Sequence, residues 1–235
     1  MLYHAPYAGE GEMHFFSDIQ HEAADAGLNV NFLAEHRALV VSKSTAGFEQ
    51  ASVAIISGIV RAAAADRDDR LKFLVFDFTH KDPGSTRAPG GFADMVAATA
   101  DLIVDAPVIT LAWARGPMKG LDFDLAMSCS TLVAEQTASF SFAGDPFDLL
   151  GLYAALGRRI GFARAERLIE SDPLLSAQDA QELLMVRDVA PARPGHDGIA
   201  TYLAQFERRY NAAQAIFRAQ RIAEPPIDRR PVNLR

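Results

Sequence analysis

Short apolar segments alternate along this chain with segments whose apolar residues recur at a helical period. Residues 73–78 and 108–113 are apolar runs with the length of buried β-strands. Between them, residues 92–104 repeat apolar side chains at the spacing of an amphipathic helix. Strands that alternate with helices pair in parallel through right-handed crossovers. The pattern therefore predicts an α/β domain built on a mostly parallel sheet.

The flanking parts of the chain extend this pattern. An earlier strand is expected within residues 32–42, followed by a helix that carries Glu49 in its first turn. Further on, Ser176 and Asp179 have the spacing of a capping box at a helix start. An apolar stripe over residues 199–222 predicts a long final helix.

Three parts of the chain differ in pattern, and we expect them to differ in role. Residues 1–28 are polar and punctuated by glycine, and are expected to form an N-terminal arm. Residues 29–197 carry the alternation of strands and helices and are expected to form the core domain. Residues 198–235 combine the final helix with a tail whose prolines disfavour regular structure.

The segment 107–142 carries the strongest functional signal. A strand runs into a turn bounded by Gly116 and Gly120, and a helix follows directly. Backbone N–H groups in the first turn of a helix lack intrahelical partners and carry a partial positive charge, so they can bind a developing oxyanion. Two acids, Asp122 and Asp124, stand near that helix start and would repel a phosphate. The arrangement therefore favours acyl chemistry over phosphate binding.

This segment resembles the crotonase superfamily, the enoyl-CoA hydratases and isomerases. Members of that family order a strand, an NG-type turn, a glycine triplet with a catalytic Glu, and a helix that reads roughly LAxxCD. Gly116 matches the turn glycine, and the letters LAMSC of residues 125–129 match the helix. Residues 161–191, GFARAERLIESDPLLSAQDAQELLMVRDVAP, resemble the family's GKARAMELILTG–ISAEEALEWGLVNRVVP region. With a weaker match through residues 39–78, the resemblance covers about two thirds of the chain.

The resemblance implies a fold and a chemistry. The fold is a crotonase-like spiral of ββα units with C-terminal helices. The substrate is an acyl-CoA thioester, with hydration or isomerisation of an enoyl-CoA as the default reaction. Coenzyme A is then part of the substrate, and no separate cofactor is implied. The resemblance also implies a homotrimer or a dimer of trimers.

The catalytic positions of the motif are altered in this chain. The family's glycine triplet reads Gly120, Leu121, Asp122, and its catalytic Glu corresponds to Asp124, one methylene shorter. By resemblance, the N–H groups of Gly120 and Leu121 are the candidate oxyanion donors, and Asp124 is a candidate general acid/base. Asp124 could instead serve only to stabilise the helix N-terminus. Asp122 is expected to cap the helix or face solvent.

The family's remaining functional positions fall in two loops. Its second catalytic Glu would lie within residues 143–148, where the register is open and Asp145 and Asp148 flank the position. Asp145 is the second candidate acid/base, although loops also carry solvated acids. The other oxyanion donor would lie within residues 83–91, a stretch without the family's AGAD motif. His80 and Lys119 are polar residues near the expected pocket, and surface exposure would explain both.

Composition excludes several other classes of function. The net charge of −7 and the pI near 5.3 argue against nucleic acid or an anionic membrane surface as a partner. The six histidines show no HExxH or similar spacing, so no metal is implied. One cysteine allows no internal disulfide, and the first residues lack the basic region of a secretory signal. We expect a cytoplasmic protein.

Two hypotheses from different classes remain open. The first is an atypical crotonase-like enzyme, for which thioester hydrolysis or decarboxylation are further possible reactions on the same oxyanion site. The second is a crotonase-fold protein without catalysis that serves as a binding or assembly subunit. The altered glycine triplet and the absence of both glutamates motivate the second hypothesis. A Clp-type protease is disfavoured, because no Ser and His occupy the matching motif positions.

Overall fold

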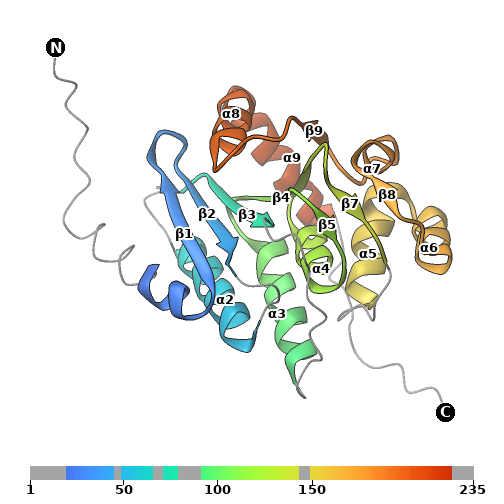
Figure 1. Cartoon of the computed structure of the whole chain (residues 1–235), viewed down its shortest axis with the longest axis horizontal. Helices are drawn as coiled ribbons and strands as arrows, with labels where there is room; N and C mark the ends of the chain where they lie inside the picture. Colours follow the sequence, from blue (N-terminus) through green and yellow to red (C-terminus); the bar gives the residue numbers. More distant parts are fainter. Residues whose placement is uncertain (1–19, 45–48, 66–70, 79–90, 143–148, 224–235) are drawn as a thin grey trace.

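The computed structural model describes residues 20–44, 49–65, 71–78, 91–142 and 149–223 (Figure 1). Its centre is a six-stranded sheet with the order β1-β2-β3-β4-β6-β9. The strands are β1 (Leu28–Leu33), β2 (Ala38–Lys43), β3 (Phe73–Phe78), β4 (Ile109–Ala114), β6 (Thr131–Glu135) and β9 (Asp188–Ala190). Only the β1–β2 pair is antiparallel among these; every later neighbour pairs in parallel. The α/β prediction with a mostly parallel sheet is confirmed.

The helices and the second sheet complete the described part of the chain. The helices are α2 (Gln50–Ala65), α3 (Phe92–Asp105), α4 (Gly120–Ser128), α5 (Leu149–Ile160), α6 (Phe162–Ser171), α7 (Ala177–Glu182), α8 (Asp197–Glu207) and α9 (Tyr210–Ala223), with a 3-10 turn, η1 (Ala34–His36). A small sheet joins β5 (Pro117–Met118), β7 (Ser139–Phe140) and β8 (Leu175–Ser176). None of the helices in the described residues is long and apolar enough to cross a membrane.

The central sheet is buried on both faces. Along β3, Leu74 and Phe76 belong to the core that α2, α3 and α4 cover. Phe73 and Val75 alternate with them and belong to a second core under α8 and α9. Figure 1 shows these helix groups on opposite sides of the sheet. Burial on both faces explains why β3 reads as a continuous apolar run and not as an alternating one.

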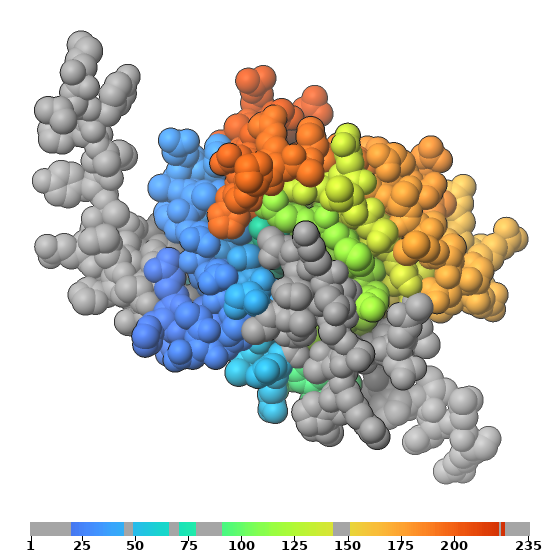
Figure 2. Space-filling model, viewed as in Figure 1, coloured from blue at the N-terminus to red at the C-terminus, as the bar shows by residue number. Residues whose placement is uncertain are grey.

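Helix α8 packs against the turn of the hairpin formed by β1 and β2. Figure 2 shows the orange residues of this helix against the blue residues of β1 and β2. The carboxylate of Glu207, at the end of α8, lies 3.4 Å from His36 Nδ1 and 3.6 Å from Lys72 Nζ. Residues far apart in the sequence therefore contact one another at this side of the sheet.

The predicted final helix is the clearest departure from the sequence-based expectation. The stripe over residues 199–222 forms two helices, α8 and α9, separated at residues 208–209. On either side of the break, Phe206 and Tyr210 both pack edge-on against Phe73, with ring centroids 5.9 and 5.3 Å from its own. Since the two aromatic residues keep a helical spacing of four, the periodicity could not reveal the break.

The expected strand region 32–42 holds the end of β1, the 3-10 turn η1 and most of β2, and Glu49 directly precedes α2 instead of lying in its first turn. The remaining expected elements agree with the structure within a few residues. The strand over residues 73–78 has the predicted bounds, and the capping box of Ser176 and Asp179 starts α7. Helix α4 begins at Gly120, directly after the turn, as expected. Residues 20–25 are helical, and Ala23 among them is fully buried. The division of the chain into arm, core and C-terminal part stays a prediction.

Candidate active site

Helix α4 runs through the interior of the domain. Its residues from Leu121 to Met127 are all buried, and it packs against α3, α5 and the strands β4 and β6. The residue before it, Lys119, has extended backbone, and no side chain of the described residues caps the helix start. Backbone N–H groups in the first turn of a helix have no intrahelical acceptors. The start of α4 therefore has the donors that the oxyanion hypothesis requires.

The turn before α4 is held in place by the small sheet. Ser139 N donates to Gly116 O at 3.4 Å, and Ser141 N donates to Met118 O at 3.0 Å. Gly120 has φ +54°, a left-handed conformation that side-chain-bearing residues rarely adopt. A Cβ at this position would meet nothing within 4 Å, so the backbone conformation and not space requires glycine. The small sheet and the left-handed Gly120 thus define the backbone conformation at the start of α4.

Asp124 lies on the same face of α4 as Leu121, one of the two candidate oxyanion donors. It is three residues after Leu121, a spacing that places both on one helix face. Its side chain belongs to the interior, with the residue only 6% exposed. Three predicted site residues, Gly120, Leu121 and Asp124, are therefore brought together in the first turns of one buried helix.

The prediction that Asp122 caps the helix or faces solvent is wrong. Asp122 is 5% exposed, and its two carboxylate oxygens accept hydrogen bonds from Lys43 Nζ at 2.7 and 2.9 Å. Lys43 is the last residue of β2, and it is also buried. Burial of a carboxylate is costly unless a cation compensates it, and Lys43 supplies that cation. The ion pair joins the carboxyl end of β2 to the first turn of α4.

Several predicted positions lie outside the described residues. Asp145, Asp148, His80 and residues 83–90 belong to this group, so their places in the site are untested. Gly91, at the end of the predicted donor loop, is the N-cap of α3 and has a left-handed backbone conformation, with φ 83°. Lys119 is exposed, as expected.

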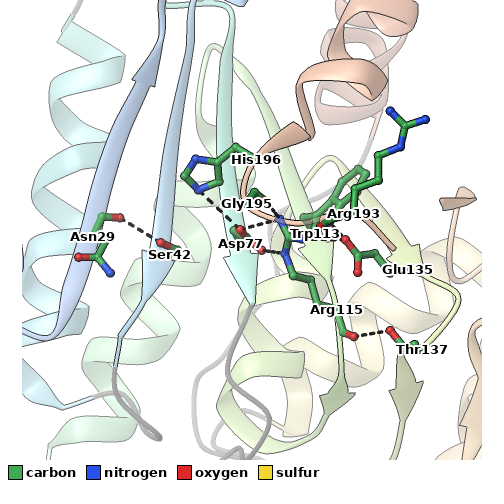
Figure 3. Close-up of polar contacts among 10 residues, drawn as sticks. All are labelled: Asn29, Ser42, Asp77, Trp113, Arg115, Glu135, Thr137, Arg193, Gly195 and His196. Atoms are coloured by element: carbon green, nitrogen blue, oxygen red, sulfur yellow. Dashed lines mark hydrogen bonds and ion pairs between the residues drawn. The ribbon is translucent and has the colours of Figure 1, made fainter. Parts of the chain in front are cut away.

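A second buried charge cluster lies at the carboxyl ends of β3, β4 and β6 (Figure 3). At its centre, Arg115 donates two hydrogen bonds to the carboxylate of Asp77, at 2.8 and 3.1 Å. It also donates to Glu135 Oε1 at 2.9 Å, and Trp113 Nε1 donates to the same oxygen at 3.1 Å. His196 Nε2 lies 3.9 Å from Asp77 Oδ2. One guanidinium therefore neutralises carboxylates from β3 and β6, the strands on either side of β4.

The same arginine also fixes the loop before α8. Its guanidinium donates to the carbonyl oxygens of Arg193 and Gly195. Burial raises the pKa of Asp77 above its ordinary value, although the hydrogen bonds and charge of Arg115 oppose this shift. Arg115 directly precedes Gly116, so the cluster anchors the start of the turn that leads into α4. We assign these residues a positioning role for the helix start.

The sequence-based reasoning missed Lys43, Asp77, Arg115 and Glu135. A signal for three of them was present, because Lys43, Asp77 and Glu135 each fall within or at the end of a strand that is buried at every position. A charge in such a strand has to find an opposite charge nearby. The partner that each charge finds depends on the order of strands, which the local pattern does not give.

Cysteine and metal chemistry find no support in the described residues. Burial raises the pKa of Cys129 to about 12, and its Sγ donates to the carbonyl oxygen of Leu125. Its thiol is therefore protonated near neutral pH and is a poor nucleophile. Within the described ranges, no three His, Cys, Asp or Glu residues gather closely enough to hold a metal ion.

The chain was compared with protein-family profiles, curated proteins and solved structures. No protein-family profile matches the chain. Among curated proteins, the enoyl-CoA isomerase/hydratase fer4 of Mycosarcoma maydis is 35% identical over 91 residues, which make up 36% of this chain. The same match spans only 32% of the fer4 protein.

Solved structures match over most of the chain. A Thermobifida fusca YX protein of the enoyl-CoA hydratase class, in complex with acetoacetyl-CoA, has a TM-score of 0.70 at 18% identity, covering 87% of this chain and 89% of its own. A monofunctional enoyl-CoA isomerase from M. smegmatis has a TM-score of 0.69 at 15% identity, covering 84% of this chain and 93% of its own. The chain therefore has the fold of the enoyl-CoA hydratases and isomerases, and the crotonase resemblance in the sequence is confirmed at the level of the fold.

Proposed function

We propose that this protein is a crotonase-type enzyme that binds an acyl-CoA thioester and hydrates or isomerises an enoyl-CoA. The observation that carries the proposal is the buried carboxylate of Asp124, one helical turn from a glycine-directed helix start without a side-chain cap. The proposal is supported by the fold shared with a protein in complex with acetoacetyl-CoA. Coenzyme A enters as part of the substrate, and we propose no other cofactor. A cytoplasmic location fits such a substrate.

In the proposed reaction the thioester carbonyl oxygen accepts hydrogen bonds from the N–H groups of Gly120 and Leu121. These bonds stabilise the enolate-like state, in which negative charge develops on that oxygen. In isomerisation, Asp124 takes a proton from the carbon next to the carbonyl and returns it two carbons further along. As the enolate returns to the thioester, the double bond comes to lie between the α- and β-carbons. A single carboxylate suffices for this sequence, because the same group takes and returns the proton.

Hydration requires a second group. A water oxygen must bond to the β-carbon while its proton leaves to a base, and the α-carbon must then take up a proton. We propose Asp145 for one of these roles and Asp124 for the other. A second oxyanion donor within residues 83–91 would complete the site.

Replacing Asp124 by asparagine is expected to lower kcat at least about a hundredfold with KM nearly unchanged, because an acid/base group acts mainly in the transition state. The absorbance of the conjugated enoyl thioester provides the assay: it falls when a 2-enoyl-CoA is hydrated and rises when a 3-enoyl-CoA is isomerised. Asp105→Asn makes the same chemical change at an exposed position of α3 and should leave turnover unchanged. Wild-type turnover in the Asp124→Asn variant would show that Asp124 is not the acid/base.

The side chains of Leu121 and Asp122 support a second candidate function, in which the protein is a crotonase-fold subunit that binds acyl-CoA without catalysis. Both positions carry side chains where the family has glycines, and the carboxylate of Asp122 is bound to Lys43. Absence of turnover in the wild type on all 2-enoyl-CoA and 3-enoyl-CoA substrates, together with measurable acyl-CoA binding, would favour this alternative. Activation by Asp124→Glu, which restores the family's side-chain length, would identify a weakened hydratase or isomerase.

We further propose that the protein assembles as a homotrimer or a dimer of trimers. Large apolar side chains after residue 160 are exposed, and an oligomer would cover them. They are Phe162, Leu174, Leu184, Ile216 and Ile222, each more than half exposed. Light scattering is expected to give a mass of three or six chains at micromolar concentration. A stable monomer under those conditions would contradict the proposal.

A further inference from the structure

A concave groove lies between β9 and α8, on the sheet face opposite α4. It has a volume of about 790 Å³, within the range of small-molecule sites. Its lining residues belong to β9 and the segments on either side of it, to α8, and to the break between α8 and α9. Figure 1 shows where these elements lie in the fold. The oxyanion site proposed above lies on the other face of the sheet, so the groove is a separate feature.

The groove concentrates positive charge on a chain with a net charge of −7. Four arginines line it, Arg187, Arg193, Arg208 and Arg209. Among the described residues, Asp188 is the single acid in its lining. The neighbouring acid Glu207 is directed away from the groove, toward His36 and Lys72. All four side chains are exposed, so water screens their mutual repulsion, but together they give the groove a positive potential that favours an anion.

The groove's side chains are organised by contacts. The guanidinium of Arg187 stacks over the ring of Phe206, with its Cζ 5.1 Å from the ring centroid. Arg193 Nη1 donates to Thr201 Oγ1 at 2.9 Å, and Figure 3 shows its guanidinium turned away from the Arg115 cluster. The hydroxyl of Tyr202 donates to Asp188 Oδ2 at 2.7 Å. The single acid thus accepts a hydrogen bond from Tyr202 and lies 3.8 Å from Arg187 Nε, so it offsets one of the four arginine charges. The groove keeps an excess of positive charge for a ligand.

From this geometry we infer that the groove binds a small anion with adjacent phosphate groups. Guanidinium groups present paired N–H donors that match phosphate oxygens in geometry and charge. Thr201 and Gln205 add neutral polar groups to the same lining. A diphosphate can be inorganic or part of a nucleotide, and the shared chemistry is that of two linked phosphates.

Calorimetric titration of the full chain with pyrophosphate, and separately with ADP, tests the inference. We expect one pyrophosphate per chain with a dissociation constant below about 1 mM that rises with salt. Tighter binding of ADP than of pyrophosphate would assign the diphosphate to a nucleotide; equal or weaker binding would assign it to an inorganic source. The double variant Arg208→Gln/Arg209→Gln is expected to raise the dissociation constant at least about tenfold.

A matched control separates a site from general charge attraction. Arg164→Gln/Arg167→Gln removes the same charge from exposed positions of α6, outside the groove, and should leave binding unchanged. No pyrophosphate binding by the wild type, or equal weakening in the two double variants, would overturn the inference. Loss of acyl-CoA turnover in the groove variant alone would also overturn it, because the groove would then belong to the substrate site.

Discussion

Replacing Lys43 by methionine is expected to lower the free energy of unfolding by about 3–5 kcal/mol. Both members of the Lys43–Asp122 pair are buried, with side chains 2% and 7% exposed. The substitution keeps an apolar stem of similar length but removes the ammonium group that neutralises the carboxylate of Asp122. A buried carboxylate that loses its cation is strongly destabilising.

Urea denaturation followed by circular dichroism measures this effect. In the double variant Lys43→Met/Asp122→Leu both charges are absent, and much of the lost stability should return, because a buried ion pair can be replaced by apolar groups at little cost. Lys72→Met is the control: Lys72 lies 3.6 Å from Glu207, and both side chains are 26% exposed. That change should cost no more than about 1 kcal/mol. Equal losses in Lys43→Met and Lys72→Met would contradict the compensating role of Lys43.

Replacing Arg115 by methionine is expected to be at least as damaging, with a loss of about 4 kcal/mol or more, because two buried carboxylates lose one shared cation. The side chains of Asp77 and Glu135 are 1% and 5% exposed. The carbonyl oxygens of Arg193 and Gly195 lose their donor in the same step. Hydrogen exchange should therefore increase in the loop before α8, beyond any general loss of stability.

The loss is also expected to depend on pH. The pKa of Asp77 is already raised by burial, and removal of Arg115 removes the largest of the effects that oppose this rise. The folded state then holds a proton that the unfolded state releases, so stability falls as pH rises through the folded pKa. Urea curves should show a larger loss at about pH 8 than at about pH 5. Arg164→Met, at an exposed position of α6, should show neither the loss nor the pH dependence. A pH-independent loss would show that Asp77 does not carry the effect.

Local patterns determined the α/β class, the parallel strands and the position of the helix that carries the candidate site. A strand that is buried on both faces is recognisable in the sequence as a nearly continuous apolar run, as β3 shows. Gly120 and Asp124 were also candidates from the sequence, because both lie within one short segment that resembles the crotonase motif, and their roles stay a prediction. Signals of this kind depend on neighbouring residues in the chain and are therefore readable without the fold.

The tertiary structure alone decided the charge pairs and the groove. Lys43 and Asp122 are separated by 79 positions, and Arg115 reaches Asp77 across 38 positions and Arg193 across 78. Likewise, the arginines of the groove come from the position before β9, the loop after β9 and the break between α8 and α9. Which of these residues meet depends on the order of strands and on the break between α8 and α9. Strand order and helix breaks are set by the packing of the whole core, so no single segment of the sequence encodes them.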